Sequence, residues 1–267
     1  MKLINYILSG VANRFSPLLL GKHPRNTWLA FNWSNLNQLR TFMKRAGSLI
    51  PDVNSTVVDV GAGKLPYFNF VDAKTEKYIA VDYDEILNES YIDDRIKRRV
   101  GTAEELPVED AIADVVLMNQ VLEHVNCPDQ SFAEVARVIK PGGMFIGSVP
   151  HVSPVHLEPY DFRRYTDLGL RQLLLKHGFR VVEVCGSGGV YSCAAFLISM
   201  DWVLSKRKDG EGQQFSTTRA FWLSPVIGAM NIAGWLADRL LPESGRTPAN
   251  LTWVAVSERP TSAAKAA

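Results

Sequence analysis

Between residues 56 and 149 the chain alternates short β-branched apolar runs with segments of helical periodicity, which restricts the fold more than any other feature. This alternation is typical of repeated strand–helix–strand units, whose strands form a parallel sheet. The predicted strands span residues 56–60, 77–81, 113–118 and 144–149, with a weaker one near Arg98. The pattern therefore predicts an α/β domain with a mostly parallel sheet and helices on both faces.

The rest of the chain predicts a helical region before this domain and an insertion after it. Helices are predicted at 28–49, 129–139 and 167–177, and further strands at 180–185 and 250–256. Between these two strands lies a long, apolar and mostly helical stretch. The predicted division is a helical region at 1–50, a core at 51–190, a helical insertion at 191–249, a final core strand at 250–258 and a tail at 259–267.

The net charge argues against nucleic acid as a partner, and the cysteine content argues against disulfides and a cysteine zinc site. The chain has 29 Lys and Arg against 28 Asp and Glu, a formal net charge of +1, so no overall field attracts nucleic acid. Cys127, Cys185 and Cys193 have neither an even count nor a C-x-x-C spacing, which argues against a disulfide framework or a cysteine zinc site. We expect a cytoplasmic protein that binds no nucleic acid, with membrane association left open.

A glycine-rich turn follows the first predicted strand, in the sequence Val-Val-Asp-Val-Gly-Ala-Gly at 57–63. Gly61 and Gly63 allow a tight turn and a close approach of the backbone to a ligand. Asp82 lies nineteen residues beyond Gly63, at the end of the second predicted strand. A carboxylate at about this interval reaches the two hydroxyls of a ribose, so the pattern predicts an adenosine site.

The absence of two sequence motifs narrows the choice of ligand. A dinucleotide site needs a third glycine, and Pro66 stands at that position. A phosphate-binding G-K-[ST] loop is also absent, because Leu65 follows Lys64. S-adenosylmethionine, which has adenine and ribose but no phosphate, fits better.

Four motifs in this order make the chain similar to the class I S-adenosylmethionine-dependent methyltransferases, a Rossmann-like family that includes small-molecule and ubiquinone-biosynthesis methyltransferases. They are the glycine motif at 58–63, Asp82 with Tyr83, the Gly-Thr-Ala-Glu-Glu-Leu-Pro run at 101–107, and the segment 114–143. The resemblance implies a seven-stranded sheet and S-adenosyl-L-methionine as cofactor. The cofactor-binding residues that it implies are Asp59, Gly61, Ala62, Gly63, Asp82, Tyr83, Thr102, Ala103, Glu104, Asn119 and Gln120.

The acceptor side is less defined. His151 follows the strand at 144–149 and is the candidate general base. The alternative, given equal weight, is that His151 only forms a hydrogen bond to a backbone carbonyl. Glu123 and His124 resemble part of a Glu-x-x-Glu-His run that is associated with a divalent metal in ubiquinone-biosynthesis enzymes. Gln120 replaces its first carboxylate, which weakens a site for a hard cation, so we expect no metal.

The insertion raises the question of partners. Residues 221–241 are strongly apolar and have to be covered by the protein's own core, by a second copy in a homodimer or by a membrane surface, and we expect the core. The resemblance implies methyl transfer, most simply to oxygen, on a small-molecule, glycan or lipid-linked acceptor. A non-catalytic regulatory or assembly subunit that binds the cofactor and a nicotinamide-dependent oxidoreductase are the alternatives.

Overall fold

The computed structural model describes residues 18–19, 26–51, 54–83, 93–206, 213–242 and 247–259. The chain separates into two compact units. The helical unit comprises the described residues of 1–41, 151–161 and 186–250, and the core unit comprises those of 42–150, 162–185 and 251–267. The predicted tail beyond residue 259 and all but two of the first 25 residues lie outside the described residues.

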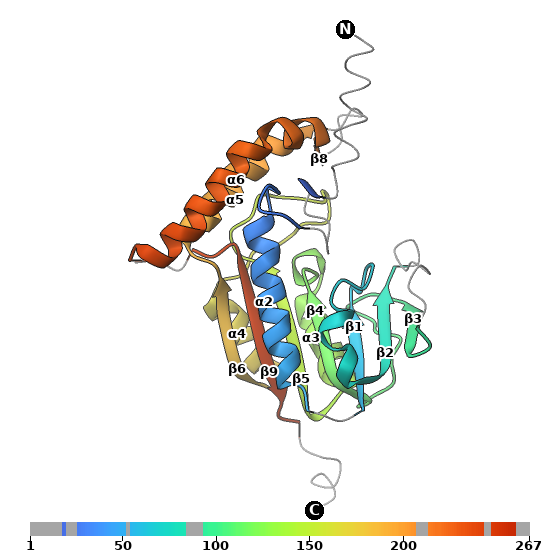
Figure 1. The fold of residues 1–267 in the computed structure, drawn as a ribbon. Helices are drawn as coiled ribbons and strands as arrows, with labels where there is room; N and C mark the ends of the chain where they lie inside the picture. The colour runs from blue at the N-terminus through green and yellow to red at the C-terminus, as the bar shows by residue number, and fades with distance from the viewer. Residues whose placement is uncertain are drawn as a thin grey trace, which may run out of the picture. The chain divides into compact units, whose positions relative to one another are not determined.

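Seven strands form one sheet in the order β3-β2-β1-β4-β5-β9-β6 (Figure 1). Strand β1 pairs in parallel with β2 and β4, β2 with β3, and β4 with β5, while β9 runs against its neighbours. This mostly parallel sheet confirms the predicted fold class. The strands are β1 (Ser55–Val60), β2 (Thr75–Asp82), β3 (Ile96–Val100), β4 (Ala113–Asn119), β5 (Ile139–Pro150), β6 (Phe179–Ser187) and β9 (Asn250–Ser257).

Apolar side chains cover both faces of this sheet, because successive residues of a strand point to opposite sides. Val58 belongs to a cluster that contains Phe132 of α3 (Pro128–Val138) and Leu170 of α4 (Asp167–Lys176). Val57 belongs to the opposite cluster, with Met43 of α2 (Trp33–Leu49). The central strands are therefore buried on both faces, which explains their continuous apolar sequences.

The last strand fills a slot between β5 and β6. Trp253 of β9 is fully buried and stacks edge-on against Phe145, with ring centroids 5.4 Å apart. Its indole packs over Gly147 of β5, where a Cβ would lie 2.1 Å from Trp253 Cζ2 and 2.3 Å from the carbonyl oxygen of Met118. Only glycine fits at this position.

The helical unit contains an antiparallel pair of helices and a small β-ribbon. The chain forms α5 (Val190–Val203), β7 (Leu204–Lys206), β8 (Gln213–Phe215) and α6 (Thr217–Leu240), and β7 and β8 pair as antiparallel strands. Asp238 near the end of α6 accepts hydrogen bonds from the backbone N–H groups of Gly189, Tyr191 and Ser192 at the start of α5. One carboxylate thus caps α5 and joins the ends of both helices.

The expectation that the protein's own core covers residues 221–241 is wrong for much of this stretch. Trp222 is 61% exposed and Leu240 is 77% exposed, and Val226, Ile232 and Leu236 are exposed as well. By length and composition α6 is also suited to crossing a membrane, although a third of its most apolar window is buried in the protein. Packing places small and polar residues of α6 inside together with Ile227, and several of its large apolar residues face outward.

Candidate functional site

The turn after β1 has the conformation that its glycines predict. Gly61 has φ +69° and Gly63 has φ +51°, a region that L-residues rarely adopt. The backbone N–H groups of Gly61 and Ala62 donate to the carbonyl oxygen of Val81 over 2.9 and 3.1 Å. A Cβ on Gly61 would meet Val121 Cγ2 at 2.2 Å, whereas a Cβ on Gly63 would meet no atom within 4 Å. The turn is held against β2, and beside Gly63 it leaves room for a ligand.

Two short 3-10 helices follow this turn in place of a long α-helix. They are η1 (Phe68–Phe70) and η2 (Asp72–Lys74), and the chain enters β2 directly after them. A dinucleotide site places its pyrophosphate on the N-terminus of the helix that follows the glycine turn. Residues 54–83 are all described and contain no α-helix, so this turn disfavours a dinucleotide.

Asp82 ends β2 beside the glycine turn. Its Oδ2 accepts a hydrogen bond of 2.8 Å from the backbone N–H of Gly63, and its Oδ1 accepts one of 2.8 Å from the N–H of Tyr83. An ionised carboxylate has about four acceptor positions, so Asp82 can accept further bonds from a ligand. Tyr83 lies next to it with an exposed side chain. The Asp82 carboxylate therefore holds the turn and can still accept hydrogen bonds from two neighbouring hydroxyl groups of a ligand.

Asp59 is the second-last residue of β1 and is buried. Its Oδ2 accepts a hydrogen bond of 2.5 Å from the hydroxyl of Tyr78 in β2. Burial raises the pKa of the Asp59 carboxyl to about 7, against the Tyr78 hydrogen bond, which lowers it, and with a further increase from the charge of Asp82. Asp59 is therefore a carboxyl group that changes charge near neutral pH.

Asn119 and Gln120 lie at the carboxyl end of β4, level with the end of β2, because Val60 pairs with both Val81 and Met118. Asn119 is buried, its Oδ1 accepts a 2.9 Å hydrogen bond from the Ser148 hydroxyl, and its Nδ2 has no hydrogen-bond partner. Gln120 has φ +57°, unusual for a residue with a side chain, and its backbone N–H donates to the Ser148 carbonyl at 2.8 Å. An unsatisfied donor and a strained backbone at one strand end are typical of a ligand site.

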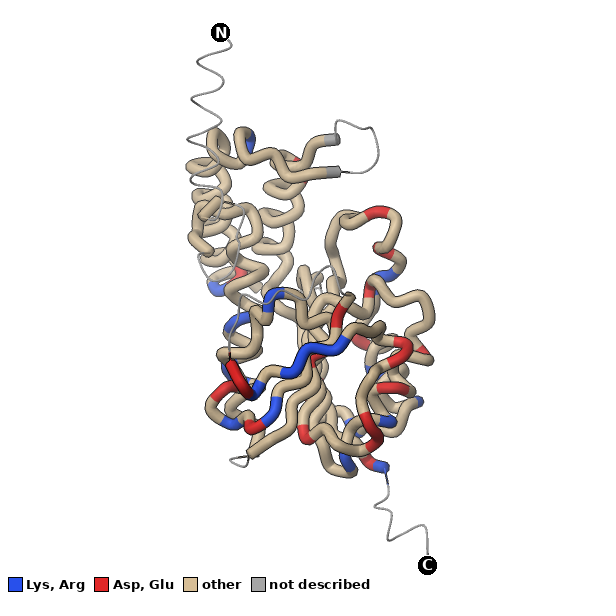
Figure 2. Tube along the Cα trace, turned by 90° about the vertical axis from the view of Figure 1, so that its right-hand side faces the viewer, with Lys and Arg blue, Asp and Glu red and all other residues tan. Residues whose placement is uncertain are grey.

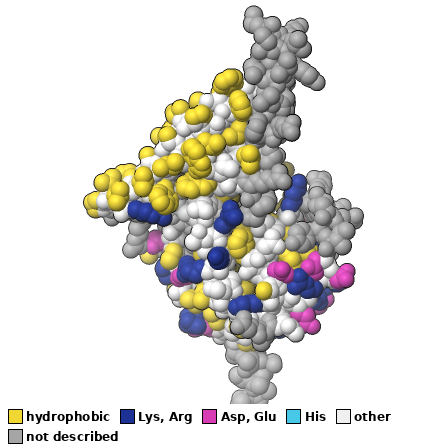
Figure 3. Space-filling model, in the orientation of Figure 1, with side chains coloured by type: hydrophobic (Ala, Val, Ile, Leu, Met, Phe, Trp, Pro, Cys, Tyr) yellow, Lys and Arg dark blue, Asp and Glu magenta, His cyan; other side chains and the backbone are white. Residues whose placement is uncertain are grey.

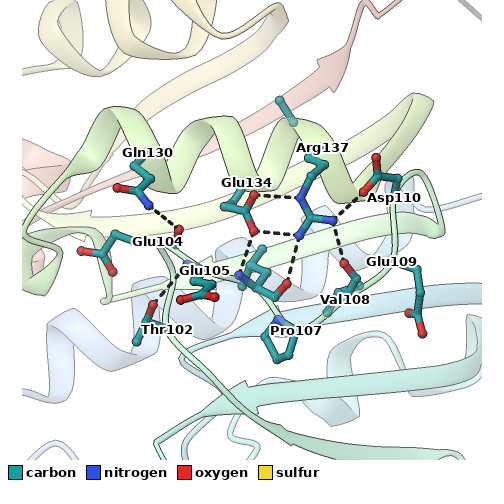
Figure 4. A network of polar contacts seen from close by, with 12 residues as sticks. Thr102, Glu104, Glu105, Pro107, Val108, Glu109, Asp110, Gln130, Glu134 and Arg137 are labelled. Carbon is teal, nitrogen blue, oxygen red and sulfur yellow. Dashed lines mark hydrogen bonds and ion pairs between the residues drawn. The ribbon is translucent and has the colours of Figure 1, made fainter.

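The segment from Thr102 to Glu104 contacts its own loop and the start of α3 (Figure 4). The Thr102 hydroxyl accepts a 3.1 Å bond from the backbone N–H of Glu105, and Ala103 is buried. Oε1 of Glu104 accepts bonds of 2.9 and 3.3 Å from the backbone N–H groups of Asn126 and Cys127, just before α3. The Glu104 carboxylate therefore caps the start of a helix, and its contribution to a cofactor site stays a prediction.

Sequence reasoning missed the pair that fixes this segment. Glu134 accepts a 2.8 Å bond from the backbone N–H of Leu106, and Arg137 donates to the carbonyl oxygens of Leu106 and Val108 over 2.9 and 2.8 Å (Figure 4). The two side chains also form an ion pair of 2.7 Å, which lowers the pKa of Glu134. Their spacing of three residues on a helix was the available signal, but it does not reveal the loop that they hold.

The residues predicted on the acceptor side lie in different surroundings. His151 directly follows the last residue of β5, is half-buried, and donates its backbone N–H to the carbonyl oxygen of Ala249 over 2.9 Å. Glu123 is fully buried in a 3-10 turn, η3 (Leu122–His124), and its Oε1 lies 3.6 Å from His124 Nε2. The role of His151 as a base and the absence of a metal at Glu123 and His124 both stay predictions.

The doubly wound sheet has the fold of the class I S-adenosylmethionine-dependent methyltransferases, and the candidate adenosine site lies at the ends of β1, β2 and β4. Solved structures support this fold. A chain of the complex between the Haloferax volcanii Trm112 methyltransferase activator and a methyltransferase has a TM-score of 0.54 at 19% identity, over 87% of this chain and 96% of that one. The [4+2]-cyclase SpnF has a TM-score of 0.55 at 16% identity, over 85% of this chain and 82% of the cyclase. At these identities the likeness shows the fold alone.

Residues 58–147 of the chain match the family model described as a methyltransferase domain. A probable S-adenosylmethionine-dependent methyltransferase of Mycolicibacterium smegmatis is 33% identical over 138 residues, 49% of this chain and 54% of the relative. A Mycobacterium tuberculosis protein of the same description is 31% identical over 140 residues, 49% of this chain and 50% of that protein. The chain spans about half the length of these curated relatives.

The cofactor implied by this family is S-adenosyl-L-methionine, and the observed site suits it. Asp82 has spare acceptor positions for the two ribose hydroxyls, and the space beside Gly63 admits a ligand against the backbone. The free Nδ2 of Asn119 can donate to an acceptor of the cofactor. The buried carboxyl of Asp59, with a pKa near neutral, can ionise when a positive group comes close.

Proposed function

We propose that this protein transfers a methyl group from S-adenosylmethionine to an oxygen atom of a small-molecule, glycan or lipid-linked acceptor. The observation that carries the proposal is Asp82, bonded at 2.8 Å to Gly63 in a glycine turn that has room for a ligand and no following α-helix. This combination favours an adenosine ligand without a pyrophosphate. When bound, S-adenosylmethionine supplies a methyl group on a positively charged sulfur, which a nucleophilic acceptor takes up.

The residues at the strand ends have distinct roles in this proposal. Asp82 accepts hydrogen bonds from the ribose hydroxyls, and the backbone of Gly61, Ala62 and Gly63 together with Asp59 holds the methionine end. Tyr83 lies beside the adenine, whose amino group and ring are bounded by Thr102, Ala103 and Glu104. Asn119 and Gln120 complete the edge at β4. Positioning of this kind supplies most of the acceleration in a displacement whose donor is already activated.

His151 is the base in the proposed reaction. A hydroxyl acceptor has to lose its proton as the new bond to carbon forms, and a neutral imidazole nitrogen can take that proton near pH 7. Chain connectivity supports this choice, because His151 directly follows β5 and ligands of doubly wound sheets bind beyond the carboxyl ends of the strands. The reaction needs no metal in this scheme. We place it in the cytoplasm, which agrees with three cysteines that form no disulfide.

A screen of hydroxyl-bearing acceptors for S-adenosylhomocysteine release tests the proposal. With an active acceptor, His151→Ala should lower kcat at least about 100-fold and change S-adenosylhomocysteine affinity less than twofold. His177→Ala is the matched control, because His177 lies at the end of α4 and bonds to Asp129 at 2.9 Å. Calorimetric binding of S-adenosylhomocysteine with no turnover on any acceptor would favour a regulatory or assembly subunit. Binding of NAD instead would favour an oxidoreductase.

A further inference from the structure

Helix α6 has its polarity reversed relative to a surface helix of a globular protein. Its buried residues include Ser224, Gly228, Asn231 and Gly234. Between Arg219 and Arg239 its exposed positions carry no charge and no hydrogen-bonding group except the indole N–H of Trp222. These exposed positions are Trp222, Pro225, Val226, Ala229, Ile232, Ala233 and Leu236. Exposed side chains are normally the polar ones, so this helix is built for apolar surroundings on its outer side.

Specific contacts inside the helical unit fix this orientation. Asn231 Nδ2 donates to the carbonyl oxygens of Trp28 and Ala30 over 2.9 and 2.8 Å. A Cβ on Gly228 would lie 2.4 Å from the Trp28 ring. Rotating α6 to bury its apolar side would break both bonds and create this clash. These contacts of Asn231 and Gly228 therefore keep the apolar side of α6 exposed.

Helix α5 meets this surface at Trp202, which lines a groove together with Trp222 and Val226 of α6. Tyr191, Ala194, Ile198 and Trp202 are the exposed apolar residues of α5 and recur every three or four positions. Figure 3 shows hydrophobic side chains gathered along α6. Near Trp202 and Trp222 the surface is hollowed by a groove of about 680 Å³. We call the exposed apolar residues of α5 and α6 together the apolar face.

We propose that the apolar face binds the surface of a phospholipid bilayer that contains anionic lipids. The proposal concerns a site other than the cofactor site and does not depend on methyl transfer. The apolar stripe of α6 runs for about 30 Å between its two arginines at 1.5 Å per residue. Helices with such a stripe, basic residues and tryptophans bind at the boundary between headgroups and acyl chains.

The charges agree with an anionic bilayer. Figure 2 shows few charged residues along α5 and α6. Arg219 and Arg239 mark the two ends of the stripe, and the Arg239 guanidinium lies 3.7 Å above the Trp235 ring. Asp238 is turned toward the start of α5, where it accepts backbone hydrogen bonds, so Asp201 is the exposed acid that remains on α5 and α6. Arginines and aromatic rings at both ends suit headgroup depth.

The length of α5 favours lying in the surface over crossing the bilayer. The 14 residues of α5 span about 21 Å, less than the roughly 30 Å of a hydrocarbon core. The inner side of α6 is occupied by protein, including residues 28–30, which leaves one side for lipid. One lipid-facing side is the pattern of an interfacial attachment.

Co-sedimentation with two kinds of vesicle tests this proposal. The wild-type protein should bind vesicles of phosphatidylcholine with 30% phosphatidylglycerol at least about tenfold more strongly than the double variant Val226→Glu/Leu236→Glu. The matched control is Leu168→Glu/Leu175→Glu, which adds the same charges at exposed apolar positions of α4 and should bind like the wild type. Arg219→Gln and Arg239→Gln should each lower binding to the anionic vesicles about fivefold and leave binding to pure phosphatidylcholine unchanged.

Two results would overturn the proposal. One is a wild-type protein that binds neither kind of vesicle. The other is a wild-type dimer in light scattering that Val226→Glu/Leu236→Glu converts to a folded monomer, since a second copy would then cover the face. Circular dichroism checks the fold of each variant. If the double variant unfolds, Leu240→Glu replaces it at a residue that is 77% exposed, and loss of its vesicle binding is again the expected result.

Discussion

Replacing Asp59 by Asn should make the free energy of unfolding less sensitive to rising pH. Burial raises the pKa of this carboxyl from 3.8 to about 7. Because the folded-state pKa is the higher one, the folded protein holds this proton more tightly, and the group destabilises the fold increasingly as pH rises from about 4 to about 7. The linkage relation gives a loss of about 2 to 3 kcal/mol in the free energy of unfolding between pH 5 and pH 8. Asn is neutral, nearly the same size and still accepts a bond from Tyr78, so it removes this loss.

Urea unfolding at pH 5 and pH 8, without cofactor, measures the effect. The wild type should lose about 2 to 3 kcal/mol more between the two pH values than Asp59→Asn, and the comparison cancels the titration of other groups. Glu76→Gln is the control, because Glu76 is an exposed carboxylate on the neighbouring strand β2 and should keep the wild-type pH dependence. An equal loss in the wild type and Asp59→Asn would show that the buried carboxyl does not hold a proton near neutral pH, and the reasoning would fail.

Four further outcomes are expected. Asp82→Asn should weaken S-adenosylhomocysteine binding about 10- to 100-fold in calorimetry by removing charge-assisted hydrogen bonds, and NAD should bind neither form; an unchanged affinity would contradict the ribose contact. Gly147→Ala should lower the free energy of unfolding by about 1 to 3 kcal/mol, because its Cβ would overlap the Met118 carbonyl; a neutral effect in urea unfolding would argue against this packing. Arg137→Ala should release the loop at residues 101–110, measured as faster amide hydrogen exchange there, and unchanged exchange would speak against the network. Chelation by EDTA should leave turnover unchanged, and strict dependence on added magnesium would place a metal at Glu123 and His124.

The sheet and the glycine turn could be predicted because their signals are local. Central strands buried on both faces appear as continuous apolar runs, and Gly61, Gly63 and Asp82 follow from the geometry of one turn. Strand β3 was only weakly indicated, because Lys97, Arg98 and Arg99 give this edge strand a polar sequence. Its position at the edge of the sheet leaves Lys97 exposed and Arg98 and Arg99 half-buried.

Other features depend on contacts between distant residues. The exposed side of α6 is set by Asn231, whose partners Trp28 and Ala30 lie about 200 residues earlier in the chain. The Glu104 carboxylate meets the start of α3, 22 residues further on. Apolar composition predicts that α6 is a helix with a covered surface, but it does not indicate which side faces the protein. That choice needs the three-dimensional position of carbonyl groups.

The position of β9 between β5 and β6 affects how the chain folds during its synthesis. Until β9 is made, both of those strands have an unpaired edge, and Gly147 lacks the indole of Trp253 that covers it. Ribosomes add about 5 to 20 residues per second, so the stretch between the end of β6 and the start of β9 takes on the order of 3 to 13 s to synthesise. Open edges of apolar strands promote aggregation. During that interval the unpaired edges of β5 and β6 expose the nascent sheet to aggregation. Slow translation of this stretch, or a truncation before residue 250, should therefore increase aggregation of the chain.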